Sequence, residues 1–135
     1  MMEQKTMRRR GSEAEQLAAD YLVAKGYAIR ERNWQPHPQH MEVDIIAQDG
    51  ATMVFVEVKQ RTDEDLDPAE AVNAHKMRLI SRAADIYLRM QPHLYYYRFD
   101  IIAINGNPPN AKINHIEDAF MAPLTTVGPT PRGMA

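Results

Sequence analysis

The spacing of hydrophobic positions in the first third of the chain predicts a helix followed by a strand. Apolar side chains recur at helical intervals from Ser12 onward, and Ser12 with Glu15 three residues later forms a capping-box pattern, which predicts the helix start. Gly26 is typical of a helix C-terminus, because glycine accepts a positive φ. We expect a strand at residues 28–34 and a loop at 36–40, where prolines and histidines gather.

Alternating polar and apolar residues between positions 42 and 59 predict a β-hairpin. Residues 42–47 alternate and then become apolar, and residues 52–59 are rich in β-branched side chains. Asp49 and Gly50 lie between the two runs, a pair that favours a tight turn.

The second half of the chain predicts another helix and two more strands. Residues 67–70 contain an N-cap Asp, then Pro, then an acid at the capping-box position, so we expect a helix from there to about Met90. Strands are expected at residues 95–104 and, as a small edge strand, at 112–116. The expected buried stripe of the helix consists of Val72, Leu79, Ala83, Ile86 and Met90.

This order of elements predicts one mixed α/β domain, with a mixed central β-sheet flanked by helices. The 135 residues suit a single domain. We expect residues 1–10, with four basic side chains, to be a flexible basic N-terminal arm, and residues 11–122 to be the folded domain. Residues 123–135, rich in Gly, Pro and Thr, are expected to form a disordered C-terminal tail.

Composition excludes several kinds of site. The chain has no cysteine, which excludes disulfides, thiolate metal sites and cysteine nucleophiles. Its net charge of −2 gives no overall sign of a polyanionic partner, so any nucleic acid would bind through local basic groups and a divalent ion.

We see neither a signal-peptide core nor an apolar run of membrane-spanning length, and expect a cytoplasmic protein with no membrane partner. The histidines lack zinc-type spacing, and we expect loop or surface roles for His37, His40, His75, His93 and His115.

Charged residues inside the predicted hairpin are the strongest sign of chemistry. Strand side chains alternate between faces, so Glu42 and Asp44 share one face, and Glu57 and Lys59 share a face of the next strand. If those faces coincide, Asp44 and Glu57 meet with Lys59 beside them. Two carboxylates and a backbone carbonyl are ligands that Mg²⁺ or Mn²⁺ prefers, and a neighbouring lysine can orient or deprotonate a water. The alternative is an edge hairpin whose solvent-facing charges form cross-strand salt bridges.

The same residues resemble a known signature. Asp44, followed thirteen positions later by Glu57-Val58-Lys59, resembles the motif of the PD-(D/E)xK nuclease superfamily. Taken together, the chain resembles the bacterial YraN family, whose members are predicted endonuclease-like proteins related to Holliday-junction resolvases. The matching segments are Gly11-x-x-Ala14-Glu15-x-x-Ala18-x-x-Tyr21-Leu22, Gly26-Tyr27, Glu31-Arg32-Asn33-Trp34, Glu42-Val43-Asp44-Ile45-Ile46-Ala47, Val54-Phe55-Val56-Glu57-Val58-Lys59-x-Arg61 and Arg98-Phe99-Asp100.

The resemblance implies a restriction-endonuclease-like α/β fold for residues 11–122 and metal-dependent hydrolysis of phosphodiester bonds in DNA, including branched or structured DNA. It implies that Asp44 and Glu57 bind Mg²⁺ (or Mn²⁺) and that Lys59 is the catalytic lysine. Cutting a junction on both sides would require two active sites, and hence a homodimer. The alternative function is a non-catalytic nucleic-acid-binding protein of the same fold in DNA repair, recombination or uptake; a third is a structural or adaptor domain.

Three further residues are assigned to the site by the same resemblance. Glu15 matches the first-helix acid that reaches the metal through water, although the capping box explains it as well. Glu42 matches the family's acid two residues before the Asp, and would either support the metal ligands, the favoured role, or form a salt bridge. Lys76 matches a lysine of the following helix and lies in its apolar stripe, so it either points into the site or extends along the helix to solvent. Met41 departs from the family pattern, which usually has Gly there.

Several arginines are candidates for contacts with DNA phosphates. The candidates are Arg61, Arg78, Arg82 and Arg98, with Arg61 favoured because it is near Lys59 in sequence. The alternative is that they are simply solvated. Asp100 shares a strand face with Arg98, and we expect a salt bridge between them.

Overall fold

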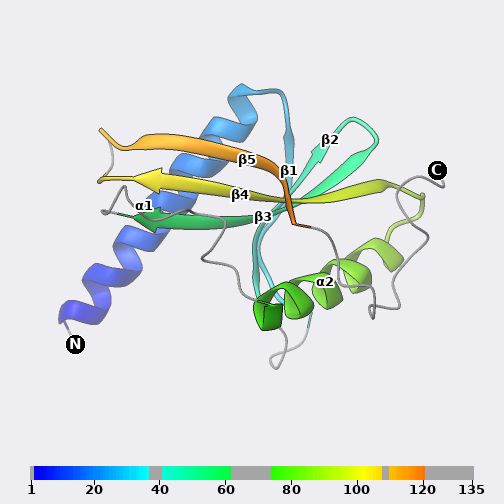
Figure 1. Ribbon diagram of the computed structural model, residues 1–135, viewed down its shortest axis with the longest axis horizontal. Coiled ribbons are helices and arrows are strands. Elements are labelled where there is room, and N and C mark those ends of the chain that lie inside the picture. The colour runs from blue at the N-terminus through cyan, green and yellow to red at the C-terminus, as the bar shows by residue number, and fades with distance from the viewer. Residues whose placement is uncertain (1, 37–40, 62–73, 108–109, 121–135) are drawn as a thin grey trace.

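The fold is described from a computed structural model, which covers residues 2–36, 41–61, 74–107 and 110–120. Its elements follow the predicted order, with helices on either side of one sheet (Figure 1). They are α1 (Met2–Ala24), β1 (Ala28–Trp34), β2 (Val43–Asp49), β3 (Thr52–Arg61), α2 (Ala74–Arg89), β4 (Tyr96–Asn105) and β5 (Lys112–Phe120).

The five strands form one mixed sheet in the order β1-β2-β3-β4-β5. Neighbouring strands are antiparallel except β3 and β4, which are parallel. Parallel strands need a crossover connection, and α2 lies in the segment that supplies it. The mixed α/β prediction is therefore confirmed, and the arrangement is consistent with a restriction-endonuclease-like fold.

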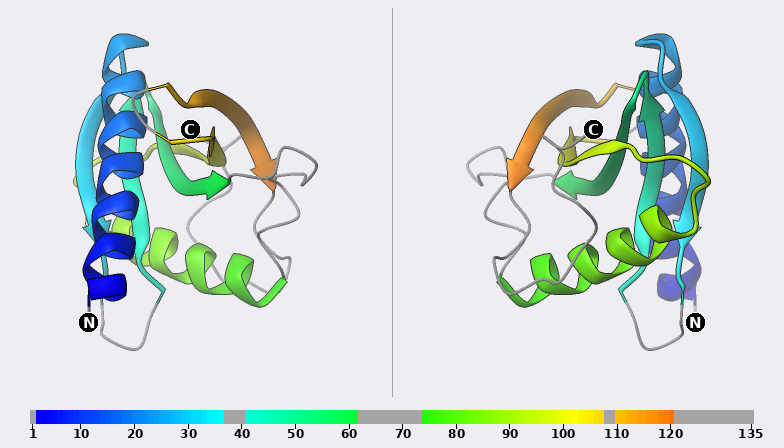
Figure 2. Two further views of the ribbon diagram at one scale, coloured as in Figure 1. Left: turned by 90° about the vertical axis from the view of Figure 1, so that its left-hand side faces the viewer. Right: turned by 90° about the vertical axis from the view of Figure 1, so that its right-hand side faces the viewer.

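The two helices pack on opposite faces of the sheet (Figures 1 and 2). Strand β3 shows the division, because Val54 and Val56 belong to the core under α1, whereas Met53 and Phe55 belong to the core under α2. This alternation is the two-residue period of a strand buried on both faces. The face on which a β3 side chain lies therefore decides which helix it meets.

The first helix begins earlier than the sequence predicts. It starts at Met2 rather than at Ser12, so most of the expected N-terminal arm is helical, and Ser12 lies inside the helix and not at its start. Its end was predicted correctly, since Gly26 follows it with a φ of 97°. The expected C-terminal tail at 123–135 lies outside the described residues, as do residues 37–40 of the expected loop.

The second helix buries a different stripe from the predicted one. Of the expected residues, Ala83 is buried, Leu79 and Ile86 are half-buried, and Met90 follows the helix with 63% of its surface exposed. The expected start at 67–70 and Val72 lie outside the described residues. The buried side chains are Ile80, Ser81, Ala83, Ala84, Tyr87 and Leu88. The face of α2 that packs on the sheet therefore includes several small residues, which the spacing of large apolar side chains does not predict.

The remaining strands agree closely with prediction. Strand β1 has its predicted bounds, and β5 lies at the predicted edge but continues to Phe120 beyond an irregularity in its pairing with β4. In the part of the chain that the structure describes, no helix is long and apolar enough to cross a membrane.

Candidate functional site

The hairpin of β2 and β3 brings the predicted carboxylates to neighbouring positions. Ile45 pairs with Val56, so Asp44 and Glu57 occupy the next position of the same register. Strand β3 lies in the middle of the sheet, and only 6% of Glu57 is exposed. The alternative of an edge hairpin with solvent-facing charges is therefore wrong for this strand.

Two lysines from different elements contact the buried glutamate. The Nζ atom of Lys76 on α2 lies 2.8 Å from Oε1 of Glu57, and the Nζ atom of Lys59 on β3 lies 3.2 Å from the same oxygen. Of the two alternatives for Lys76, the structure shows the one in which it points into the site. We call Asp44, Glu57, Lys59 and Lys76 the carboxylate–lysine cluster.

Negative charge is crowded around Asp44. Its Oδ2 accepts a hydrogen bond of 2.8 Å from the backbone N–H of Val58. Burial, and then the charge of Glu57, raise the pKa of Asp44 to about 7, with smaller contributions from Glu15 and Glu42. Burial also raises the pKa of Glu42, reinforced by the charges of Glu15 and Glu57. Bringing these acids together costs free energy, which a bound cation would reduce.

The two lysines differ in how they hold their protons. Burial lowers the pKa of Lys59, and the neighbouring Lys76 lowers it further. Burial alone would also lower the pKa of Lys76, but its contact with Glu57 outweighs this and the pKa is raised. Lys76 therefore keeps its proton more firmly, and Lys59 is the one closer to acting as a base.

Glu15 reaches the neighbourhood of the cluster from α1. Its charge contributes to the raised pKa of Asp44. Glu15 therefore lies near the cluster, where the resemblance places the first-helix acid. Arg32 on β1 lies beside it, with 4.0 Å between Nη2 and Oε1 of Glu15, and donates a 2.8 Å hydrogen bond to Gln16. Arg32 belongs to a segment that resembles the family, but no sequence pattern predicts a role for it.

The candidate DNA-contacting arginines are dispersed. Arg78 is exposed on α2, on the side of the helix turned away from the sheet. Arg98 lies on the α1 side of the sheet, where its guanidinium contacts Asp100 and Glu117. The side chain of Arg61 lies outside what the structure describes. The structure thus places neither Arg78 nor Arg98 in the carboxylate–lysine cluster.

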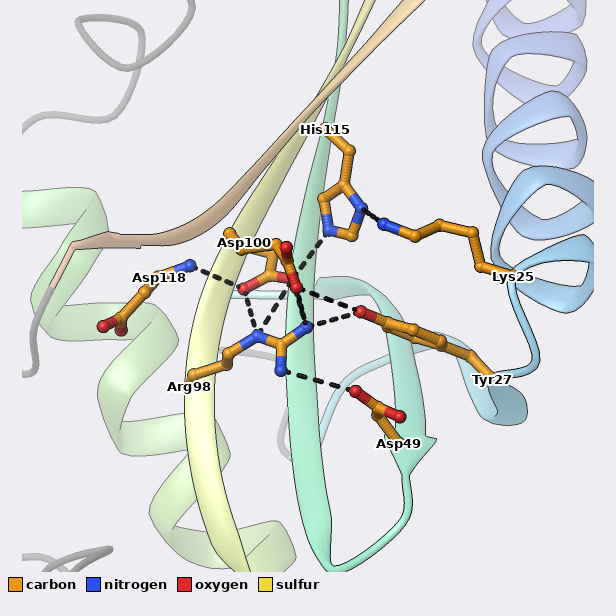
Figure 3. A network of polar contacts seen from close by, with 8 residues as sticks. Lys25, Tyr27, Asp49, Arg98, Asp100, His115 and Asp118 are labelled. Carbon is orange, nitrogen blue, oxygen red and sulfur yellow. Dashed lines mark hydrogen bonds and ion pairs between the residues drawn. The ribbon is translucent and has the colours of Figure 1, made fainter.

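A second polar group, the Arg98–Asp100 network, lies on the α1 side of the sheet (Figure 3). Asp100 is fully buried, and its carboxylate lies 3.0 Å from Nε of Arg98 and 2.7 Å from Nε2 of His115. It also accepts a 2.9 Å hydrogen bond from the backbone N–H of Asp118. The expected Arg98–Asp100 salt bridge is confirmed.

The surface role expected for His115 was wrong, because only 2% of its side chain is exposed. Its Nδ1 lies 3.0 Å from Nζ of Lys25, at the end of α1. Since an ammonium can only donate, Nδ1 accepts and Nε2 donates to Asp100. The available signal was alternation, since Ile113 and His115 share a strand face that turns inward.

The residues of the cluster fit a divalent cation. In the described parts of the chain, no three His, Asp or Glu side chains converge as metal ligands. Mg²⁺ is often held by only one or two carboxylates, with waters and substrate phosphates completing its coordination. Asp44 and Glu57 supply two carboxylates, and a bound cation would offset the burial and the charge of Glu57 that raise the pKa of Asp44.

Comparison with known proteins supplies the family. Residues 14–104 match the model of the uncharacterised protein family UPF0102. The chain belongs to this family. It is 41% identical over 115 residues to a UPF0102 protein of Bacteroides fragilis, an alignment that covers 84% of this chain and 93% of the relative. A UPF0102 protein of Thermodesulfovibrio yellowstonii is 44% identical over 111 residues, covering 82% and 94% of the two chains. UPF0102 is the YraN family, so the resemblance found in the sequence is confirmed.

Replacing Asp44 by asparagine in this UPF0102 chain should stabilise the metal-free protein at alkaline pH. A carboxyl with a raised pKa stabilises the fold when protonated, and this contribution disappears as pH rises through about 7. Asparagine can keep the bond from Val58 without the charge. In urea denaturation with EDTA, we expect Asp44→Asn to gain about 1–2 kcal/mol relative to wild type between pH 5 and pH 8. A stability difference that does not change with pH would contradict this assignment.

Proposed function

We propose that this chain is a metal-dependent DNA endonuclease that hydrolyses phosphodiester bonds. The observation that carries the proposal is the carboxylate–lysine cluster, in which a buried glutamate on the central strand contacts two lysines, next to an aspartate whose pKa is raised to about 7. Strongly shifted pKa values among clustered acids and bases are typical of functional sites. The resemblance of Asp44, Glu57 and Lys59 to the PD-(D/E)xK signature supports the same chemistry.

Each residue of the cluster has a role in this proposal. Asp44 and Glu57 would hold Mg²⁺ or Mn²⁺, which when bound would polarise the phosphate and lower the pKa of the attacking water. Lys59, whose pKa is lowered, would orient that water and accept its proton. Glu15 and Glu42 add negative charge near the two proposed metal ligands.

The cluster suits catalysis better than binding alone. A protein that only binds nucleic acid needs basic groups at its surface to contact phosphates. Burying two carboxylates beside each other weakens attraction to a polyanion and costs free energy. A divalent ion at this position would reverse both effects, which is why we favour the enzyme over the binding protein.

The substrate we propose is branched or otherwise structured DNA, in the cytoplasm. This part of the proposal is supported by the resemblance to Holliday-junction resolvases. Symmetric cutting of a junction requires two active sites, so we propose that two copies of the chain act together on it.

A panel of DNA substrates tests the function. Linear, nicked and four-way-junction DNA would be incubated with the purified chain in Mg²⁺, Mn²⁺ or EDTA, and we expect cleavage only with metal. Salt-dependent binding without cleavage of any substrate would instead favour a non-catalytic nucleic-acid-binding protein, because phosphate contacts release counterions. Neither cleavage nor binding at low salt would contradict both.

A further inference from the structure

One carboxylate oxygen of the cluster is contacted by two cations. Oε1 of Glu57 is contacted by two ammonium groups, at 2.8 Å from Lys76 and 3.2 Å from Lys59. An ammonium at this distance from a carboxylate oxygen occupies space that a metal ion ligated by the same oxygen would need. The carboxylate of Glu57 is therefore already paired with two cations.

Within the four residues of the cluster the lysine charges offset the carboxylate charges, while Glu15 and Glu42 add negative charge nearby. When all four groups are ionised, Asp44 and Glu57 are negative, and Lys59 and Lys76 are positive. A divalent cation bound at Oε1 of Glu57 would lie beside both ammonium groups, and like charges in close contact repel strongly at a half-buried site. Binding the ion tightly therefore requires that a lysine leaves or that anionic phosphate enters.

Lys76 is better placed to leave than Lys59. Lys59 lies two residues from Glu57 on the same strand, so its stem stays beside that carboxylate. Lys76 reaches the cluster from α2 on a flexible four-carbon stem, so it can turn away from Glu57 without any change in β3; the two lysine side chains are similarly exposed, at 21% and 19%.

We propose that Lys76 occupies the position of the metal beside Glu57 in the metal-free protein and leaves that oxygen when a divalent ion binds. The displaced ammonium then becomes a donor for a phosphate oxygen of the substrate, so that metal and DNA strengthen each other's binding. This inference rests on the proposed function, because it assigns the metal to Asp44 and Glu57. It adds that Lys76 limits the affinity of the free protein for the ion.

Titration calorimetry with Mn²⁺ alone, without DNA and without an activity readout, tests this inference. We expect Lys76→Met to bind Mn²⁺ about tenfold tighter than wild type or more, since a competing positive charge is removed beside a ligand. Lys76→Arg, which keeps the charge, should bind weakly like wild type. The matched control is Arg82→Gln, which removes an exposed cation of the same helix and should leave the affinity unchanged.

The outcomes separate this inference from the proposed function. Tighter binding by Lys76→Met that disappears in the double variant Asp44→Asn/Lys76→Met supports it and locates the ion. If wild type binds Mn²⁺ and Lys76→Met, shown by circular dichroism to be folded, binds equally or more weakly, the inference is overturned while the metal site stands. If neither protein binds Mn²⁺, the inference is overturned together with metal-dependent cleavage.

Discussion

Replacing Lys59 by alanine is expected to lower the rate of DNA cleavage by about 10²- to 10⁴-fold, the usual contribution of one acid–base group. Lys59 is the lysine of the cluster whose pKa is lowered, and it lies 3.2 Å from a proposed metal ligand. The loss should appear in the single-turnover rate at saturating metal, because Lys59 is assigned to proton transfer and not to holding DNA.

The control for this substitution is Lys112→Ala, which removes an exposed lysine from β5. It should cleave at the wild-type rate. The assignment of Lys59 fails if Lys59→Ala retains more than about half of the wild-type rate, since one lost acid–base group should cost far more.

The largest expected loss of stability comes from the other polar group, in which Asp100→Asn should lower the free energy of unfolding by about 2–4 kcal/mol. Asp100 is fully buried and accepts hydrogen bonds from Arg98, His115 and the N–H of Asp118. An amide cannot match these donors, and it leaves the Arg98 guanidinium without its buried counter-ion. Urea denaturation at pH 7 measures the loss.

Asp85→Asn is the matched control, because Asp85 forms an i,i+4 pair with Arg89 near the surface of α2. Such a pair contributes only about 0.3–0.5 kcal/mol. Burial alone would raise the pKa of Asp100, but the hydrogen bonds from His115, Arg98 and Asp118 outweigh it and hold the pKa below its ordinary value. The stabilisation should therefore be present at neutral pH. It should be lost as pH falls below the ordinary carboxyl pKa and through the lowered pKa of Asp100. Equal losses in the two variants at pH 7 would refute the structural importance of Asp100.

The two polar groups lie on opposite faces of the sheet and differ in how their charges are paired. The Arg98–Asp100 network joins β4 and β5 to the start of β1, where Tyr27 contacts Arg98 at 2.5 Å. Its members satisfy one another, as a group that stabilises the fold should. The carboxylate–lysine cluster lies on the face towards α2. Burial, and repulsion among its acids and their neighbours, raise the pKa of Asp44 and of Glu42, which is typical of a functional site.

The sequence was most informative where periodicity is strict. The two-residue period placed Asp44, Glu57 and Lys59 on adjoining strands, because a register slip would turn buried Val54 and Val56 to the wrong face. The same period could not show that Lys76 would reach Glu57, since that contact depends on how α2 docks against the sheet.

The failures have equally local causes. A capping-box pattern at Ser12 predicted a helix start within what is a continuous helix from Met2, because side chains that can cap are also tolerated inside helices. A surface role is predicted for His115 because the histidines lack zinc-type spacing. Its strand position nevertheless points inward, and Asp100 provides a buried partner. Such polar pairs are fixed by tertiary packing, which sequence spacing does not specify.

Cleavage of four-way-junction and linear DNA by wild type and Asp44→Asn, purified in parallel and assayed with Mg²⁺ or EDTA, tests the central claim most directly. Asparagine preserves the size of the side chain and the hydrogen bond from Val58, so that the charge of one metal ligand is the main change. We predict Mg²⁺-dependent cleavage by wild type and none by Asp44→Asn. Equal cleavage by both proteins, or none by wild type on any substrate, would contradict the assignment of Asp44 and Glu57 as the centre of a nuclease.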